Sequence, residues 1–253
     1  MLNNVDVRGT LAAASNDEAG AISWFRIDAT TTAVMHIGDT PIDKAEPYGF
    51  CSGLMNGVNY GSVTYKDGTV QIWRATISDA GDVSAELART AKLSSQLEGC
   101  VFDEPHNRLF IGEEARGIWS LDLADEASVP QLVDEISNGN GLVEDTEGLS
   151  VWRGEDGTGY VVASAQAANR FVVYDRLPPH TPRGVFTVTG SADGAVDPVS
   201  HTDGLDVTSA ALPGYPSGLL VVQDDANPVA EIDQNFKLVS WEGVESVLAL
   251  TAE

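Results

Sequence analysis

Four short stretches of the chain place a polar side chain and a glycine at the start of an apolar run. They read PYGFCS, LEGCVF, TEGLSV and TDGLDV, and the residues before the glycines are Tyr48, Glu98, Glu147 and Asp203. Glycine weakens a strand, and a carboxylate at the mouth of a buried strand is costly unless a positive group lies beside it. The recurrence therefore indicates a repeated structural position at which acids gather.

The repeat has a period of about fifty residues. The four positions are 50, 49 and 56 residues apart, and a weaker copy, NNVDV, begins at Asn3. After Glu147 the chain reads as four short strands, GLSVW, YVVASAQ, RFVVYDR and GVFTVTG, and a similar set follows Glu98. The stretch DVSAELARTAKL has a helical composition but lies where a fourth strand belongs. Repeats of this length and content predict an all-β fold of about five four-stranded propeller blades.

Antiparallel pairing predicts where the polar residues of each blade meet. The first strand begins, and the second strand ends, on the same face of a blade. The expected first-strand starts are Asn3, Tyr48, Glu98, Glu147 and Asp203, and the expected second-strand ends are Asn16, Lys66, Glu114, Gln166 and Asp224. Carboxylates placed so close together raise one another's pKa or share a cation, and hard oxygen ligands without histidine or thiolate favour calcium. The alternative is that these acids accept hydrogen bonds from backbone N–H groups at the strand starts.

Composition excludes several classes of function. The net charge of −24 disfavours nucleic acid and anionic membrane surfaces, because binding to either needs clustered Lys and Arg. The chain has no apolar run of eighteen residues and no visible signal peptide. Its four histidines are dispersed and do not make a zinc signature. The two cysteines, Cys51 and Cys100, are interpreted as small core residues, with a disulfide as the less favoured reading.

The order and spacing of many segments resemble β-propeller phytases. These segments include LNNVDVR, AAASN, YGF, SQLEG, RLFIGEE, EDTEGL, GYVVASAQ, SHTDGLDV, VVQD and QNFKLVSWE, and they cover nearly the whole chain. Members of that family are calcium-dependent enzymes that remove phosphate from inositol hexakisphosphate (phytate). The resemblance implies a six-bladed propeller of which residues 1–253 form a single domain covering about five blades.

The resemblance also implies roles for individual residues. It implies calcium ligands at Tyr48, Glu98, Asp145, Glu147, Asp197 and Asp203, with several calcium ions in the site. Glu114 corresponds to an acid beside the reacting phosphate, and with Tyr48 it is a candidate catalytic residue. Lys66 corresponds to a lysine that holds a second phosphate. The implied reaction is in-line attack on phosphorus by a metal-activated water. The enzyme is expected to be secreted or periplasmic, and monomeric if the propeller is complete.

Two departures from the family bear on activity. Asp17 stands where the family has an arginine that contacts phosphate, and the family has further chain before LNNVD that supplies about a first blade. This chain is therefore expected to bind calcium and to hydrolyse phytate weakly or not at all unless that blade is supplied. The alternatives are a calcium-dependent sugar lactonase and a non-catalytic calcium-binding propeller.

Overall fold

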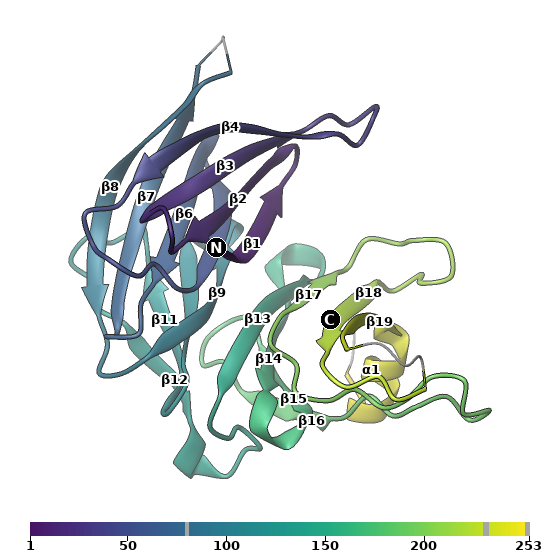
Figure 1. Ribbon diagram of the computed structural model, residues 1–253. Helices are drawn as coiled ribbons and strands as arrows, with labels where there is room; N and C mark the ends of the chain where they lie inside the picture. Colours follow the sequence, from purple (N-terminus) through teal and green to yellow (C-terminus); the bar gives the residue numbers. More distant parts are fainter. Residues whose placement is uncertain (79–80, 230–232, 251–253) are drawn as a thin grey trace. The chain divides into compact units, whose positions relative to one another are not determined.

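Five antiparallel sheets follow one another along the chain in the computed structural model, which describes residues 1–78, 81–229 and 233–250 (Figure 1). Four sheets contain four strands, and the fifth contains three within the described residues. In each sheet, strands that are consecutive in sequence are also neighbours in space. The predicted all-β fold with a repeating blade of about fifty residues is confirmed.

The strand bounds follow the predicted repeat. The first sheet consists of β1 (Leu2–Arg8), β2 (Leu11–Asn16), β3 (Ala21–Ile27) and β4 (Val34–Pro41). The second consists of β5 (Phe50–Met55), β6 (Val58–Thr64), β7 (Thr69–Ile77) and β8 (Val83–Lys92). The third consists of β9 (Leu97–Asp103), β10 (Arg108–Glu113), β11 (Gly117–Asp122) and β12 (Gln131–Glu135). The fourth consists of β13 (Thr146–Arg153), β14 (Gly159–Ala165), β15 (Arg170–Asp175) and β16 (Pro182–Phe186), and the fifth of β17 (Leu205–Thr208), β18 (Leu219–Asp224) and β19 (Asn235–Ser240).

Burial separates the inner strands from the outer ones. In β2 five consecutive residues, Leu11–Ser15, are buried, because small and apolar side chains fill both faces of an inner strand. In β8 no residue is fully buried. This strand holds the stretch DVSAELARTAKL, and it pairs with β7 from Thr69–Lys92 to Ile77–Val83. The extended pairing with β7 therefore makes this segment a strand despite its helical composition, as the repeat predicts.

The chain divides into two compact units, residues 1–113 with 120–131 and residues 114–119 with 132–253. In the first unit β1 packs against β5, and β5 packs against β9; in the second, β13 packs against β17. Neighbouring blades therefore meet through their first strands within each unit. The expectation of a single domain over residues 1–253 stays a prediction.

The interpretation of the two cysteines as separate core residues is wrong. Cys51 and Cys100 form a disulfide with Cα atoms 5.6 Å apart. Cys51 lies in β5 and Cys100 in β9, and their separation of 49 residues is one blade repeat. Cys51 lies three residues after Tyr48 and Cys100 two residues after Glu98, so the cysteines occupy nearby positions in adjacent first strands, within bonding distance of each other.

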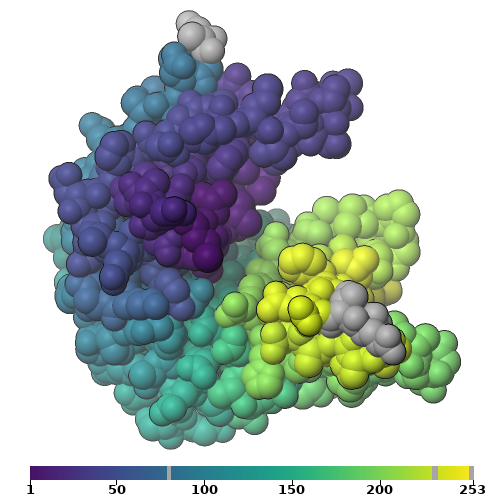
Figure 2. All heavy atoms as spheres, viewed as in Figure 1, coloured from purple at the N-terminus to yellow at the C-terminus, as the bar shows by residue number. Residues whose placement is uncertain are grey.

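The C-terminal segment WEGVESVL forms helix α1 (Trp241–Leu248), which is exposed on the surface of the second unit (Figure 2). Trp241 anchors the helix, because its fully buried ring stacks on Trp152 with the ring centroids 5.5 Å apart. Within the described residues, no helix is both long and apolar enough to cross a membrane.

Candidate metal centre

The first strand of each blade starts beside the end of its second strand, as antiparallel pairing predicts. The contacts that show this are Leu2 with Asn16, Tyr48 with Thr64, Leu97 with Glu113, Thr146 with Ala165, and Gly204 with Gln223. The predicted polar positions therefore lie at one end of every blade.

The glycines after Tyr48 and Glu147 let neighbouring first strands approach closely. A Cβ atom on Gly49 would lie 2.0 Å from the carbonyl oxygen of Glu98, and one on Gly148 would lie 2.8 Å from the carbonyl oxygen of Asp203. No side chain fits in either space. The hydroxyl of Thr64 completes the first contact by donating to the carbonyl of Glu98 at 2.7 Å. Gly49 and Gly148 thus allow the starts of adjacent blades to lie side by side.

Glu113 and Glu114 are consecutive acids with different surroundings. The Glu113 side chain is fully buried, and one of its oxygens accepts bonds from the backbone N–H and the hydroxyl of both Ser94 and Ser95. Glu114 follows the end of β10 and is half-buried. Glu113 therefore anchors the loop before β9, whereas the Glu114 carboxylate lies beside that of Glu147.

Glu114 and Glu147 bring two carboxylates together in the second unit. Each offers an oxygen within 4.8 Å of the other's, and Glu147 is only 6% exposed. Asp145 joins the same region through its backbone, because its N–H donates to the carbonyl of Glu114 at 3.0 Å and its carbonyl accepts from the N–H of Gln166 at 3.0 Å. Two carboxylates this close repel each other unless a cation or a proton lies between them.

Glu98 opens β9 in a half-buried position. The preceding residue, Leu97, pairs with Glu113, and Glu114 is the next residue along the chain. The pairing of β9 with β10 therefore directs Glu98 and Glu114 to the same end of the third blade.

Tyr48 and Lys66 lie together in the first unit. The Lys66 ammonium sits over the Tyr48 ring, 4.3 Å from its centroid, and the hydroxyl of Ser15 donates to the Tyr48 carbonyl at 2.6 Å. Lys66 is exposed, so its ammonium can meet an anion from solution. The aromatic ring fixes the direction of this ammonium.

Asp203 lies where its strand start meets the neighbouring blade. Its carboxylate accepts from the side-chain amide of Gln166 at 2.9 Å, and its N–H donates to the side-chain oxygen of Gln223 at 2.9 Å. Gln166 directly follows β14, so the start of one blade contacts the second-strand end of the blade before it. Asp203 is exposed.

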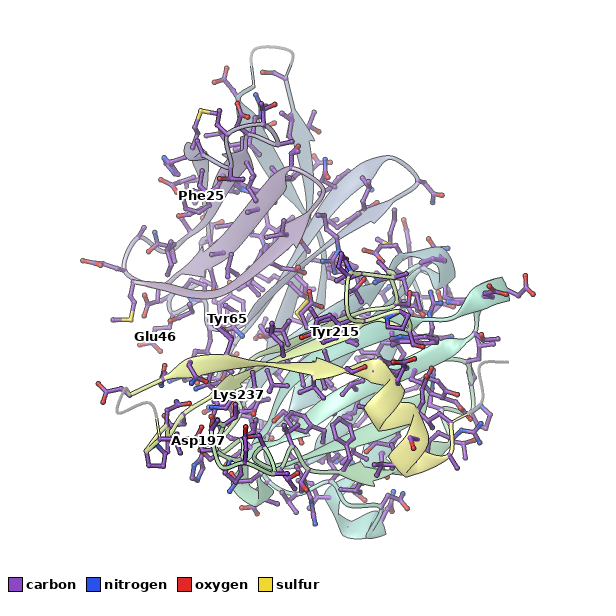
Figure 3. The ribbon with its side chains drawn as sticks, turned by 90° about the vertical axis from the view of Figure 1, so that its right-hand side faces the viewer. Phe25, Glu46, Tyr65, Asp197, Tyr215 and Lys237 are labelled. Atoms are coloured by element: carbon purple, nitrogen blue, oxygen red, sulfur yellow. A yellow bond between two sulfur atoms is a disulfide. The ribbon has the colours of Figure 1, made fainter. Side chains whose placement is uncertain are left out.

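Asp197 makes an ion pair that the sequence did not indicate. Lys237, on β19, places its ammonium 2.7 Å from Asp197 and 2.7 Å from Asp224, and it also donates to the side-chain oxygen of Asn227 at 2.6 Å (Figure 3). The hydrogen bond from Lys237 lowers the pKa of Asp197. A lysine in the apolar stretch QNFKLVSW was the only signal for this partner. The metal role of Asp197 stays a prediction.

The donor set of the centre fits a hard divalent cation. Its candidate ligands are carboxylate oxygens, which calcium prefers. Neither cysteine can serve as a ligand, because both are in the disulfide. The residues present therefore fit calcium better than zinc or copper.

Comparison with known proteins places the chain in a family context. The family model described as Phytase matches residues 2–252. A protein named 3-phytase from Bacillus subtilis (strain 168) is 34% identical over 264 residues, covering 96% of this chain and 68% of that protein. Among solved structures, a functionally unknown protein from Desulfotomaculum acetoxidans DSM 771 matches with a TM-score of 0.51 and 13% identity, and supports the fold alone. This match covers 70% of the chain, which spans about half (53%) of that protein.

Proposed function

The chain belongs to the phytase family, and we propose that it removes phosphate from phytate with a water activated by calcium ions at the acid centre. The substrate is proposed from the relative named 3-phytase. The observation that carries the metal part is the close approach of the Glu114 and Glu147 carboxylates, which offer oxygens within 4.8 Å of each other.

The proposed ligands are the acids at the strand starts. Glu114 and Glu147 are the acids of the second unit that could share one ion. Tyr48, Glu98, Asp145, Asp197 and Asp203 are the further ligands that the resemblance implies. Bound calcium would neutralise phosphate oxygens and lower the pKa of a water. Without such ions the net charge of −24 would repel a polyphosphate.

The chain's own side chains supply position and proton transfer. Glu114 is half-buried beside Glu147, where its carboxylate can orient the attacking water and accept its proton. Lys66, directed by the Tyr48 ring, can hold a second phosphate of the same substrate. This contact favours substrates that carry adjacent phosphates over simple monoesters.

The disulfide supports the proposed location. Disulfides persist in oxidising compartments and are rare in the cytosol of mesophiles. The Cys51–Cys100 bond is therefore consistent with a secreted or periplasmic enzyme.

The test measures phosphate release from phytate in millimolar calcium and in excess chelator, with calorimetric calcium titration as a second readout. The Glu114→Gln and Glu147→Gln variants should lose phosphate release and weaken calcium binding, since both remove negative charge from the centre. Glu242→Gln, an exposed acid on α1, is the matched control. Release that persists in chelator, or in both centre variants, would refute the proposal, and lactone hydrolysis without phosphate release would favour the lactonase alternative.

A further inference from the structure

The lysines of this acidic chain are unevenly distributed. The sequence contains four, and three of them, Lys44, Lys66 and Lys92, lie in the second blade or in the loop that precedes it. Lys66 is the predicted phosphate contact, whereas Lys44 and Lys92 have no role in the proposed reaction. Their position on a protein of net charge −24 therefore requires its own explanation.

Both lysines converge on one carboxylate. The ammonium groups of Lys44 and Lys92 lie 2.8 Å and 3.1 Å from the same oxygen of Asp67, the residue next to Lys66. The hydrogen bond from Lys44 makes the largest contribution to lowering the pKa of Asp67. Lys44 also lies over the ring of Tyr65, 5.1 Å from its centroid (Figure 3 labels Tyr65). Two ammonium groups share one negative charge, so the trio keeps a net positive charge.

The turn that carries Asp67 is fixed to the neighbouring strand. The Tyr65 N–H donates to the carbonyl of Thr69 at 3.0 Å, and the N–H of Leu93, next to Lys92, donates to the carbonyl of Gly68 at 2.8 Å. Gly68 has a φ of +86°, and a Cβ there would lie 2.5 Å from the carbonyl oxygen of Leu93. The backbone therefore holds the Asp67 turn and the end of β8 together, which keeps the ammonium groups of Lys44 and Lys92 near each other.

We propose that Lys44 and Lys92, positioned by Asp67, form an anion subsite that binds a phosphate group of the substrate beyond the one held by Lys66. The inference rests on the proposed function, because it assigns the subsite to a substrate with several phosphates. Lys44 keeps two donors beyond the one it gives to Asp67. The Lys92 ammonium also donates to the Asp67 carbonyl at 2.5 Å and to the Thr69 hydroxyl at 3.2 Å, so its contribution to the subsite is its positive charge. Lys92 and Lys44 are 57% and 33% exposed. Asp43 and Glu46 are exposed in the same loop as Lys44, so the subsite favours a polyanion whose charge calcium has partly neutralised.

The experiment removes the two lysine charges and compares the result with a matched loss of charge. The test variant is Lys44→Gln with Lys92→Gln. The control is Arg74→Gln with Arg183→Gln, two arginines in exposed ion pairs with Glu86 and Asp175. Phytate and inorganic phosphate binding are measured by calorimetry in a Glu114→Gln background, which prevents turnover. The KM for phytate and for a single-phosphate monoester is measured in the same double variants with Glu114 retained. Their thermal midpoints provide the folding check.

The double lysine variant is expected to bind phytate about tenfold or more weakly, which corresponds to the loss of at least one charged contact. The double arginine variant should change phytate binding less than about twofold. The KM for the monoester should stay the same, because a single phosphate occupies the reacting position alone. Equal losses of phytate affinity in the double lysine and double arginine variants would mean that only net charge matters, and would overturn the proposed subsite. Lysine-dependent phytate binding without phosphate release would refute the proposed function and leave the subsite standing.

Discussion

Glu113 and Glu114 show at the scale of single residues how neighbouring acids acquire different roles. Strand alternation sends consecutive side chains to opposite faces. Glu113 points into the protein, where Ser94 and Ser95 satisfy it, and Glu114 lies beside the Glu147 carboxylate. The sequence motif GEE predicts two acids but not which one is buried, because the serine partners lie eighteen and nineteen residues away along the chain.

This difference predicts opposite effects of two adjacent substitutions. Glu113→Ala should lower the free energy of unfolding by about 2–4 kcal/mol, because the N–H and hydroxyl groups of Ser94 and Ser95 lose their acceptor. Glu114→Ala should leave that free energy within about 1 kcal/mol and abolish phosphate release. Urea unfolding and phosphate release, measured on both variants, check the pair. Two variants with the same stability loss, or a Glu114→Ala protein that is fully active, would contradict this assignment.

Asp197 shows where resemblance and structure give different information about one residue. The resemblance implies a calcium ligand, whereas the structure places its carboxylate on the ammonium of Lys237. Lys237 is nearly buried and bonds two carboxylates and the amide oxygens of Asn227 and Asn235. An ammonium surrounded by oxygens satisfies the same electrostatic need as a bound cation. The pattern of acids in a sequence therefore predicts a cation-like environment more reliably than it predicts which cation is present.

At the scale of elements, the strands were predictable and their lateral contacts were not. Apolar alternation and turn residues are local signals, so the repeats after Glu98 and Glu147 give the observed strands. The Cys51–Cys100 disulfide depends on two first strands lying next to each other. The separation of 49 residues is close to the 50 residues between Tyr48 and Glu98 and could have indicated the bond, had each cysteine been assigned to its position in the blade.

The disulfide predicts a measurable contribution to stability. It closes a loop with a sequence separation of 49 residues between β5 and β9, which restricts the unfolded chain. The double variant Cys51→Ala with Cys100→Ala should lose about 2–4 kcal/mol of unfolding free energy. Urea unfolding of the variant and of the oxidised and reduced parent protein provides the check. A reduced parent protein that unfolds at the same urea concentration as the oxidised one would show that the bond adds nothing.

At the scale of the whole chain, the acids are far in excess of the bases. The net charge of −24 means that folding brings many carboxylates together, so self-repulsion opposes the compact state. General screening by salt relieves part of this repulsion at every exposed acid. A bound ion acts differently, because it relieves repulsion only at the residues that hold it. The two effects can therefore be separated experimentally.

Calcium is accordingly expected to stabilise the chain more than sodium chloride of equal ionic strength. A ligand at 100 times its dissociation constant adds about 2.7 kcal/mol at one site, whereas screening has no saturable component. The double variant Glu98→Gln with Glu147→Gln removes two of the proposed calcium ligands, so its melting temperature should respond equally to calcium and to sodium chloride. The same variant should melt higher than the parent protein in chelator, because it lacks the repulsion between empty carboxylates. Thermal scans of both proteins in chelator, in millimolar calcium and in matched sodium chloride make the comparison. If the variant keeps the full calcium response, the acids at the strand starts do not hold the metal.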